Sequence, residues 1–108
     1  MNQALSPTAL VTALAQLPGW QLSGDGAELA ITRRFVFADY AQTMAFVNAV
    51  AWLAQARDHH PELEVGYGHC TVRWRTHDVG GVTTRDVAAA RAVQDWLDAS
   101  ARAGHAGA

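Results

Sequence analysis

Three histidines occupy positions where they can perform acid–base chemistry. His59 and His60 are adjacent, and His77 follows after a segment that alternates apolar and polar residues. Imidazole changes charge near neutral pH, so two histidines that flank a substrate can serve as general acid and general base. Pro61 disfavours helical geometry at His60, so we expect a helix to end just before the pair. The pattern predicts a histidine corner where a helix passes into a strand.

The segment between the second and third histidines predicts a β-hairpin. Apolar residues alternate on both sides of a glycine-containing turn: Leu63, Val65 and Tyr67 before it, and Cys70, Val72 and Trp74 after it. A two-residue turn at Gly68-His69 places apolar residues opposite one another. The same register predicts two cross-strand ion pairs, Glu64 with Arg73 and Glu62 with Arg75. Extended to its open end, it sets His60 against His77, with His59 beside them.

The residue pattern leaves three interpretations of this corner open: an acid–base site, a metal site, or solvated histidines at a sheet edge. A metal needs ligands that converge on one point at about 2 Å. Adjacent residues direct their side chains apart, and no cysteine or carboxylate completes a recognisable ligand spacing, so we expect no metal and no cofactor. Elemental analysis of protein purified without an affinity tag separates these readings, because stoichiometric zinc or iron would overturn a metal-free site.

Capping signals place three helices along the chain. Each helix start carries its own pair: Ser6 before Pro7, Asp39 three residues before Gln42, and Thr83 three residues before Asp86. Pro18-Gly19 ends the first helix. The cap gives Asp86 a structural role, with a role in the site as the second reading.

The remaining segments complete an α-β-β-α-β-β-α order. Residues 19–37 predict a hairpin with a turn at Asp25-Gly26, which pairs Trp20 with Ile31. Two hairpins that form one four-stranded antiparallel sheet, with three helices packed on one face, give an α+β fold. With 108 residues, half of them hydrophobic, residues 1–108 can form a single domain, and residues 103–108 predict a disordered tail.

Composition narrows the classes of function. A net charge of −2 gives no reason to expect nucleic acid or an anionic membrane as a partner. The single cysteine fits a cytoplasmic location, and no long apolar run predicts a membrane span or a signal peptide. All eight basic residues are arginine and alanine is abundant, which is typical of a GC-rich bacterial genome.

The residues around the corner resemble the signature of the pterin-4a-carbinolamine dehydratase family. The resemblance is carried by His59-His60-Pro61-Glu62, Tyr67, Val72, Thr76-His77, Gly81 and Asp86. It implies an α+β enzyme that dehydrates 4a-hydroxytetrahydropterins to quinonoid dihydropterins. Tetrahydrobiopterin, the pterin cofactor of aromatic amino-acid hydroxylases, is recycled in this way.

The resemblance also implies roles for particular residues. His59, His60 and His77 are the expected catalytic residues. Among them, we expect His59 and His77 to exchange protons with the substrate and His60 to bind or orient it. The expected substrate-binding residues are Asp58, Asp86 and Trp20, and the alternative for Trp20 is a core aromatic.

Two positions depart from the family pattern. An acidic residue usually stands four positions before the first histidine, where this chain has Gln55. Some members have a cysteine two positions after the third histidine, where this chain has Val79. Both departures bear on the tuning of the site.

Aromatic residues on the second helix predict self-association. Phe46 and Trp52 lie off the apolar stripe of that helix, and a four-stranded sheet has free edges. We therefore expect a homodimer or homotetramer with Trp52 at one contact. Some members of the family resemble this fold while serving as partners of a transcription factor, so a protein-interaction module is an alternative function.

Overall fold

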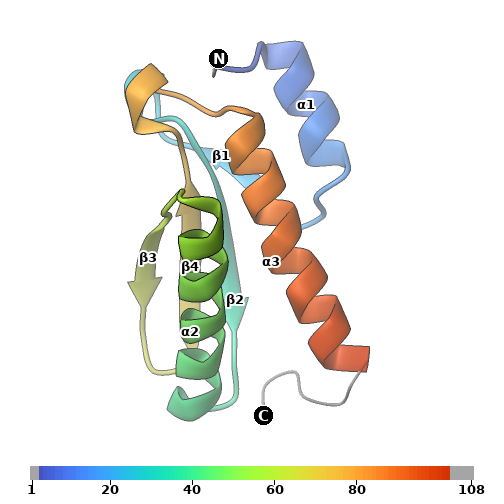
Figure 1. The fold of residues 1–108 in the computed structure, drawn as a ribbon, viewed down its shortest axis with the longest axis vertical. Coiled ribbons are helices and arrows are strands. Elements are labelled where there is room, and N and C mark those ends of the chain that lie inside the picture. Colours follow the sequence, from blue (N-terminus) through green and yellow to red (C-terminus); the bar gives the residue numbers. More distant parts are fainter. Residues whose placement is uncertain (1–2, 103–108) are drawn as a thin grey trace.

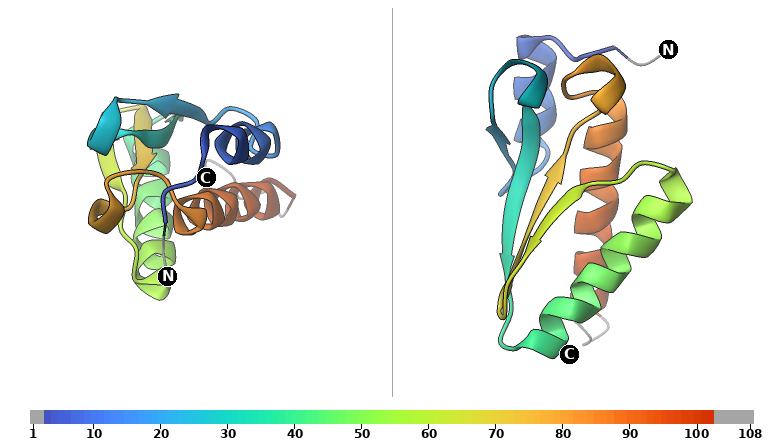
Figure 2. Two further views of the ribbon diagram at one scale, coloured as in Figure 1. Left: turned by 90° about the horizontal axis from the view of Figure 1, so that it is seen from above. Right: turned by 90° about the vertical axis from the view of Figure 1, so that its left-hand side faces the viewer.

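The computed structural model describes residues 3–102 (Figures 1 and 2). The helices and strands are α1 (Pro7–Ala15), β1 (Gln21–Ser23), β2 (Ala30–Val36), α2 (Tyr40–Arg57), β3 (Glu62–Val65), β4 (His69–Trp74) and α3 (Thr84–Arg102). Short 3₁₀ turns occupy Gly26–Glu28 and His77–Val79. This order confirms the predicted α-β-β-α-β-β-α arrangement. The disorder predicted for residues 103–108 concerns a segment outside the described residues.

The four strands form one antiparallel sheet in the order β1-β2-β4-β3. Each hairpin contributes one inner strand, and β2 and β4 pair over six positions from Ile31–Trp74 to Val36–His69. Residues of β4 alternate between buried and half-buried, so that Cys70, Val72 and Trp74 point into the core. The inner strands thus carry the hydrophobic face of the sheet.

Helices α2 and α3 cover that face, and α1 lies beside α3 near the β1 edge (Figures 1 and 2). The core unites side chains from every layer: Leu10 and Leu17, Trp20, Ile31 and Phe35, Phe46, Val50 and Ala54, Val72 and Trp74, and Ala89, Ala90 and Val93. None of the helices within residues 3–102 has both the length and the apolar character that crossing a bilayer requires.

The predicted caps of the first two helices are present. Ser6 Oγ accepts a hydrogen bond from the Ala9 amide at 3.2 Å, and Asp39 Oδ1 accepts one from the Gln42 amide at 2.8 Å. Helix α2 ends at Arg57, just before the His-His-Pro run, as predicted. Capping therefore fixes where the chain delivers the histidine corner.

The register predicted for the second hairpin is wrong by two residues. Glu62 pairs with Arg73, at 2.9 Å between Oε1 and Nε, and Val65 lies opposite Cys70. The turn is centred on Tyr67-Gly68, one residue earlier than expected. Tertiary contacts hold it there, since the Thr43 hydroxyl donates to the Tyr67 carbonyl and the Phe37 amide to the Gly68 carbonyl, each at 2.8 Å.

The register of the first hairpin also differs from the predicted one by two residues. Leu22, not Trp20, lies opposite Ile31, because residues 24–29 form a longer connection with a 3₁₀ turn. Two arginines of the other hairpin hold this connection by donating to its carbonyls. Arg73 donates to Glu28 and Arg75 donates to Ala27.

One of the two aromatics expected outside the core is buried. Phe46 is 1% exposed and packs against Phe35, Phe37 and Trp96, because α2 contacts both the sheet and the neighbouring helix α3 and so has two buried sides. Trp52 is 75% exposed, as expected.

Candidate active site

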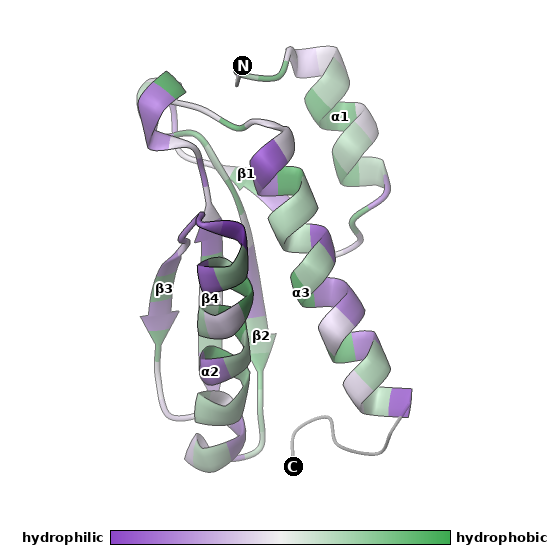
Figure 3. Cartoon of the chain, in the orientation of Figure 1, coloured by the Kyte–Doolittle hydropathy of each residue, from purple (hydrophilic) through white to green (hydrophobic). Residues whose placement is uncertain are grey.

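The end of α2, the start of α3 and the 3₁₀ turn after β4 meet at one corner. The end of α2 and the first turn of α3 carry hydrophilic residues, which are purple in Figure 3. A cavity of about 330 Å³ lies there, lined by Asp58, His59, His60, Arg75, Thr76, His77, Asp78 and Arg85. The structure thus brings the three predicted catalytic histidines and Asp58 together around one space.

A left-handed residue positions the first two histidines. Asp58 has φ 50° and ψ 43° and ends α2, a conformation that glycine adopts most readily. The chain reverses there, so that the His59 amide bonds back to the Ala54 carbonyl at 3.2 Å. The Asp58 carbonyl accepts a hydrogen bond from Arg85 at 2.8 Å, which ties the end of α2 to the start of α3.

His59 is the most firmly held of the three histidines. Its Nε2 lies 2.6 Å from Asp86 Oδ1, its ring stacks on Trp74 at 5.5 Å, and the residue is only 8% exposed. A carboxylate can only accept hydrogen bonds, so Nε2 carries the proton in this contact. Nδ1 is then the ring nitrogen that remains for other partners.

Asp86 is fully buried, and both of its carboxylate oxygens are used. Oδ2 accepts hydrogen bonds from the Thr83 amide and the Thr76 hydroxyl, each at 2.8 Å. Thr76 spends its single hydroxyl proton on Asp86, so it accepts from the Thr83 hydroxyl across 2.8 Å. The predicted helix cap is confirmed, and the same carboxylate also holds His59.

His77 lies in an exposed turn, next to a cation. Its Nε2 is 3.4 Å from a terminal nitrogen of Arg75, whose side chain is only 10% exposed. A guanidinium has no acceptor, so this contact is a hydrogen bond only when His77 Nε2 lacks a proton. His60 is exposed and lines the same cavity.

Trp20 does not join this group. It is 5% exposed and packs edge-on against Phe35 at 5.9 Å, outside the residues that line the cavity. Its predicted role in substrate binding stays a prediction.

Sequence reasoning gave no site role to Thr76, Arg75 or Arg85. Thr76 directly precedes His77, Arg75 stands two residues before it, and Arg85 directly precedes Asp86. Proximity to a candidate histidine and a candidate carboxylate was the available signal. The contacts themselves arise from the packing of α3 against the corner.

Within residues 3–102, no three side chains among His, Cys, Asp and Glu are arranged to hold a metal ion. The site therefore offers imidazole, carboxylate and guanidinium groups around a polar cavity.

The fold and this cavity define a class of α+β protein with a carboxylate-anchored histidine site on the helical side of an antiparallel sheet. The chain belongs to the pterin 4 alpha carbinolamine dehydratase family, whose model matches residues 3–96. That match confirms the resemblance drawn from the histidine signature.

Individual relatives agree with this assignment. The chain is 54% identical over 99 residues to a candidate pterin-4-alpha-carbinolamine dehydratase from Paracidovorax citrulli, covering 92% of this chain and 85% of the relative. A second such candidate, from Xanthomonas campestris pv. campestris, is 52% identical and covers 86% and 78%.

Solved structures share the fold. A transcriptional coactivator/pterin dehydratase from Brucella melitensis has a TM-score of 0.80 at 34% identity, covering 86% of this chain and 97% of that one. A pterin dehydratase-like protein described as a RuBisCO assembly factor in the alpha-carboxysome has a TM-score of 0.60 at 27% identity, covering 71% and 87%.

Proposed function

We propose that this chain is a hydro-lyase that converts 4a-hydroxytetrahydropterins to quinonoid dihydropterins and water. Membership of the family and the names of its relatives support the reaction. The observation that carries the mechanism is the convergence of His59, His60 and His77 on one cavity, with His59 anchored to Asp86 at 2.6 Å.

The reaction needs two proton transfers. The C4a–oxygen bond breaks and its electron pair leaves with the hydroxyl group, so an acid must protonate that oxygen to release water. A base removes a proton from a ring nitrogen as the new C=N bond forms. Each transfer by a positioned side chain is typically worth about 100- to 10,000-fold in rate.

His59 is the better general acid of the two. An imidazolium has two N–H groups, and at His59 one of them meets the Asp86 carboxylate while the other is free for the substrate oxygen. An imidazolium at His77 would instead direct an N–H at the Arg75 guanidinium, which cannot accept it.

His77 is accordingly the general base, and it works in its neutral form. His60 and Asp58 bind and orient the pterin from the cavity wall. Asp86 acts through His59, by fixing which nitrogen carries the proton.

The decisive experiment is a dehydratase assay with chemically generated 4a-hydroxytetrahydropterin. We expect dehydration well above the spontaneous rate. No acceleration at micromolar enzyme would refute the proposed function.

The cellular role proposed with this activity is regeneration of tetrahydrobiopterin in the cytoplasm. It needs a hydroxylase that supplies the 4a-hydroxy product. Co-expression with a pterin-dependent aromatic hydroxylase tests it, since the dehydratase should raise the number of hydroxylase turnovers per pterin.

We also propose that copies of the chain associate into a homodimer or homotetramer. Trp52 is 75% exposed and Tyr40 53% exposed on α2, and the four-residue strand β3 is a free edge. Paired edges and covered aromatics would satisfy both features. Light scattering at micromolar concentration should give a multiple of 11.6 kDa, and a monomeric mass would refute the proposal.

A further inference from the structure

We propose that a second cavity next to the histidine site binds a phosphate group on the side chain of the substrate. The preferred substrates would then be phosphorylated 4a-hydroxytetrahydropterins. This inference rests on the proposed function, since the pterin ring must first lie at the histidines.

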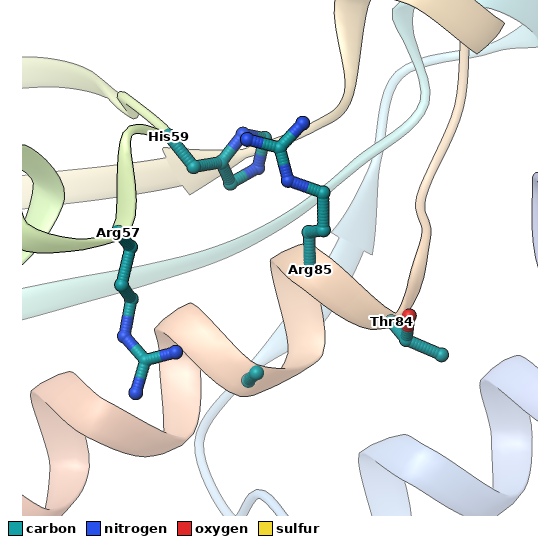
Figure 4. Close-up of a pocket in the computed structure, with 5 residues that line it drawn as sticks. Arg57, His59, Thr84 and Arg85 are labelled. Atoms are coloured by element: carbon teal, nitrogen blue, oxygen red, sulfur yellow. The ribbon is translucent and has the colours of Figure 1, made fainter. Parts of the chain in front are cut away.

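The second cavity adjoins the first. It measures about 300 Å³ and is lined by Arg57, His59, Thr84, Arg85 and Ala88 (Figure 4). His59 and Arg85 line both cavities. A ligand whose ring lies against His59 can therefore extend a substituent into the second space without leaving the site.

The lining of this second cavity is cationic. It carries two guanidinium groups and no acidic side chain. Figure 4 shows Arg57 coming from the end of α2, while Arg85 and Thr84 come from the start of α3 with His59 above them. Two independent elements thus each contribute one guanidinium group to the lining of this cavity.

The two arginines have no carboxylate partner in residues 3–102. The arginine–carboxylate ion pairs in that part of the chain are those of Arg73 with Glu62 and of Arg75 with Glu28. Arg85 is half-buried and its one hydrogen bond, to the Asp58 carbonyl, goes to a neutral group. Its remaining N–H donors and those of Arg57 are left to serve an anion.

The start of α3 contributes a positive electrostatic potential of its own. The positive end of a helix dipole favours an anion. The first amides are already used in the cap, because the Arg85 amide donates to Thr83 Oγ1 and the Asp86 amide to the Thr83 carbonyl. The guanidinium groups are therefore the principal donors.

A phosphate ester fits these donors better than other anions do. Two planar guanidinium forks match the charge and the several oxygens of a phosphate dianion. The small cavity and the net charge of −2 speak against a nucleic acid or an anionic membrane. The two cavities share His59 and Arg85 in their linings, which favours a phosphate that arrives on the substrate.

The test compares two fluorescent ligands that differ only in the phosphate: 6-hydroxymethylpterin and its phosphate monoester. Each is titrated, in buffer free of phosphate and sulfate, into the wild type, Arg57→Gln and Arg102→Gln. Arg57 lines only the second cavity. Arg102 is an exposed residue of the same α3 helix, about 25 Å from Arg85 at 1.5 Å per residue, so it controls for net charge.

We expect the wild type to bind the ester about 10-fold more tightly than the neutral pterin, the effect of one or two charge-assisted hydrogen bonds. Arg57→Gln should remove most of that preference and leave binding of the neutral pterin unchanged. Arg102→Gln should behave as the wild type.

Equal binding of both ligands by the wild type would overturn this inference alone, as would equal losses in the two variants. Binding of neither pterin would overturn it together with the proposed function. Inorganic phosphate distinguishes the source of the anion, because on our proposal it competes with the ester. Stronger binding of the neutral pterin in its presence would identify free phosphate as the ligand and overturn the substrate class.

Discussion

The two histidines that we propose to transfer protons are held in opposite ways. His59 is buried, stacks on Trp74 and donates to the Asp86 carboxylate, which accepts three hydrogen bonds in all. His77 is exposed in a 3₁₀ turn and has one longer contact, to Arg75. The site thus combines one proton position that the fold fixes with one that can adjust to the substrate.

The difference follows from the element that precedes each histidine in the chain. His59 follows a helix that is packed into the core, so its ring lies between the sheet and α3. His77 begins an exposed turn that is closed by the Thr76–Gly81 bridge and by the Gly80 amide, which donates to the His77 carbonyl at 3.1 Å. A buried charge without a partner is costly. The contact between His59 and the buried Asp86 carboxylate must therefore be formed in the stable protein.

The largest expected effect comes from Asp86→Asn. The amide would present an N–H to His59 Nε2, which forces that nitrogen to accept and opposes the imidazolium that the proposed general acid requires. We expect kcat to fall about 100- to 10,000-fold and the free energy of unfolding to fall by about 1–3 kcal/mol. Steady-state kinetics and urea denaturation measure the two effects.

The matched control is Asp95→Asn, which removes an exposed acid from the same helix. It should leave both quantities near the wild-type values. An Asp86→Asn enzyme with more than a tenth of wild-type kcat would contradict the anchoring role of the carboxylate.

Replacing each histidine by alanine separates the two sides directly. Each variant should lose about 10- to 1,000-fold in kcat, with the loss compressed by the spontaneous reaction. Only His59→Ala should also lower the free energy of unfolding, by about 3 kcal/mol, because it leaves Asp86 buried without its partner. For His77→Ala the change should stay within about 0.5 kcal/mol.

Near-wild-type turnover in both variants would reject the acid–base assignment. Equal stability losses in both would reject the contrast between a fixed and an adjustable side.

The thiol of Cys70 tests whether opening of the His77 turn extends into strand β4. Burial raises the pKa of the Cys70 thiol to about 11, so it stays protonated at pH 8 while its position in β4 is closed. We expect Ellman's reagent to react with it only after denaturant is added. Rapid reaction in the native protein would show that β4 opens along with the His77 turn.

The smallest effect is expected from Gln55→Glu, which restores the acidic residue usual in the family. A carboxylate four residues before His59, at the end of α2, favours the protonated imidazole, so the pH profile of kcat/KM should move to higher pH. Gln55 is exposed and does not line the cavity, so the shift should be under about half a pH unit. A profile displaced by a full unit would show a closer contact with His59.

Local signals in the sequence were sufficient to predict the element order, the starts of the three helices and the end of α2, whereas α1 ends at Ala15, before the predicted stop at Pro18-Gly19. Ser6, Asp39 and Pro61 act through contacts within a few residues, which a sequence displays directly. The gathering of the histidines at one corner was predicted for the same reason, since a helix end and a hairpin constrain both sides of it.

Long-range packing decided what the sequence did not reveal. A two-residue slip keeps every strand side chain on its own face, so the hydrophobic pattern could not distinguish the predicted register from the real one. Contacts from Thr43 and Phe37 to the turn decide it. The pairing of His59 with Asp86 likewise spans 27 residues and depends on how α3 docks.

The carboxylate of Asp86 both caps α3 and accepts a hydrogen bond from His59. Fraying of the first turn of α3 therefore disturbs the geometry of the histidine site. The first turn of α3 cannot unwind without releasing the imidazole, because the Thr83 amide and His59 Nε2 donate to the same carboxylate. Amide hydrogen exchange in residues 83–87 therefore reports how often the enzyme is out of its working geometry, even before any substrate arrives.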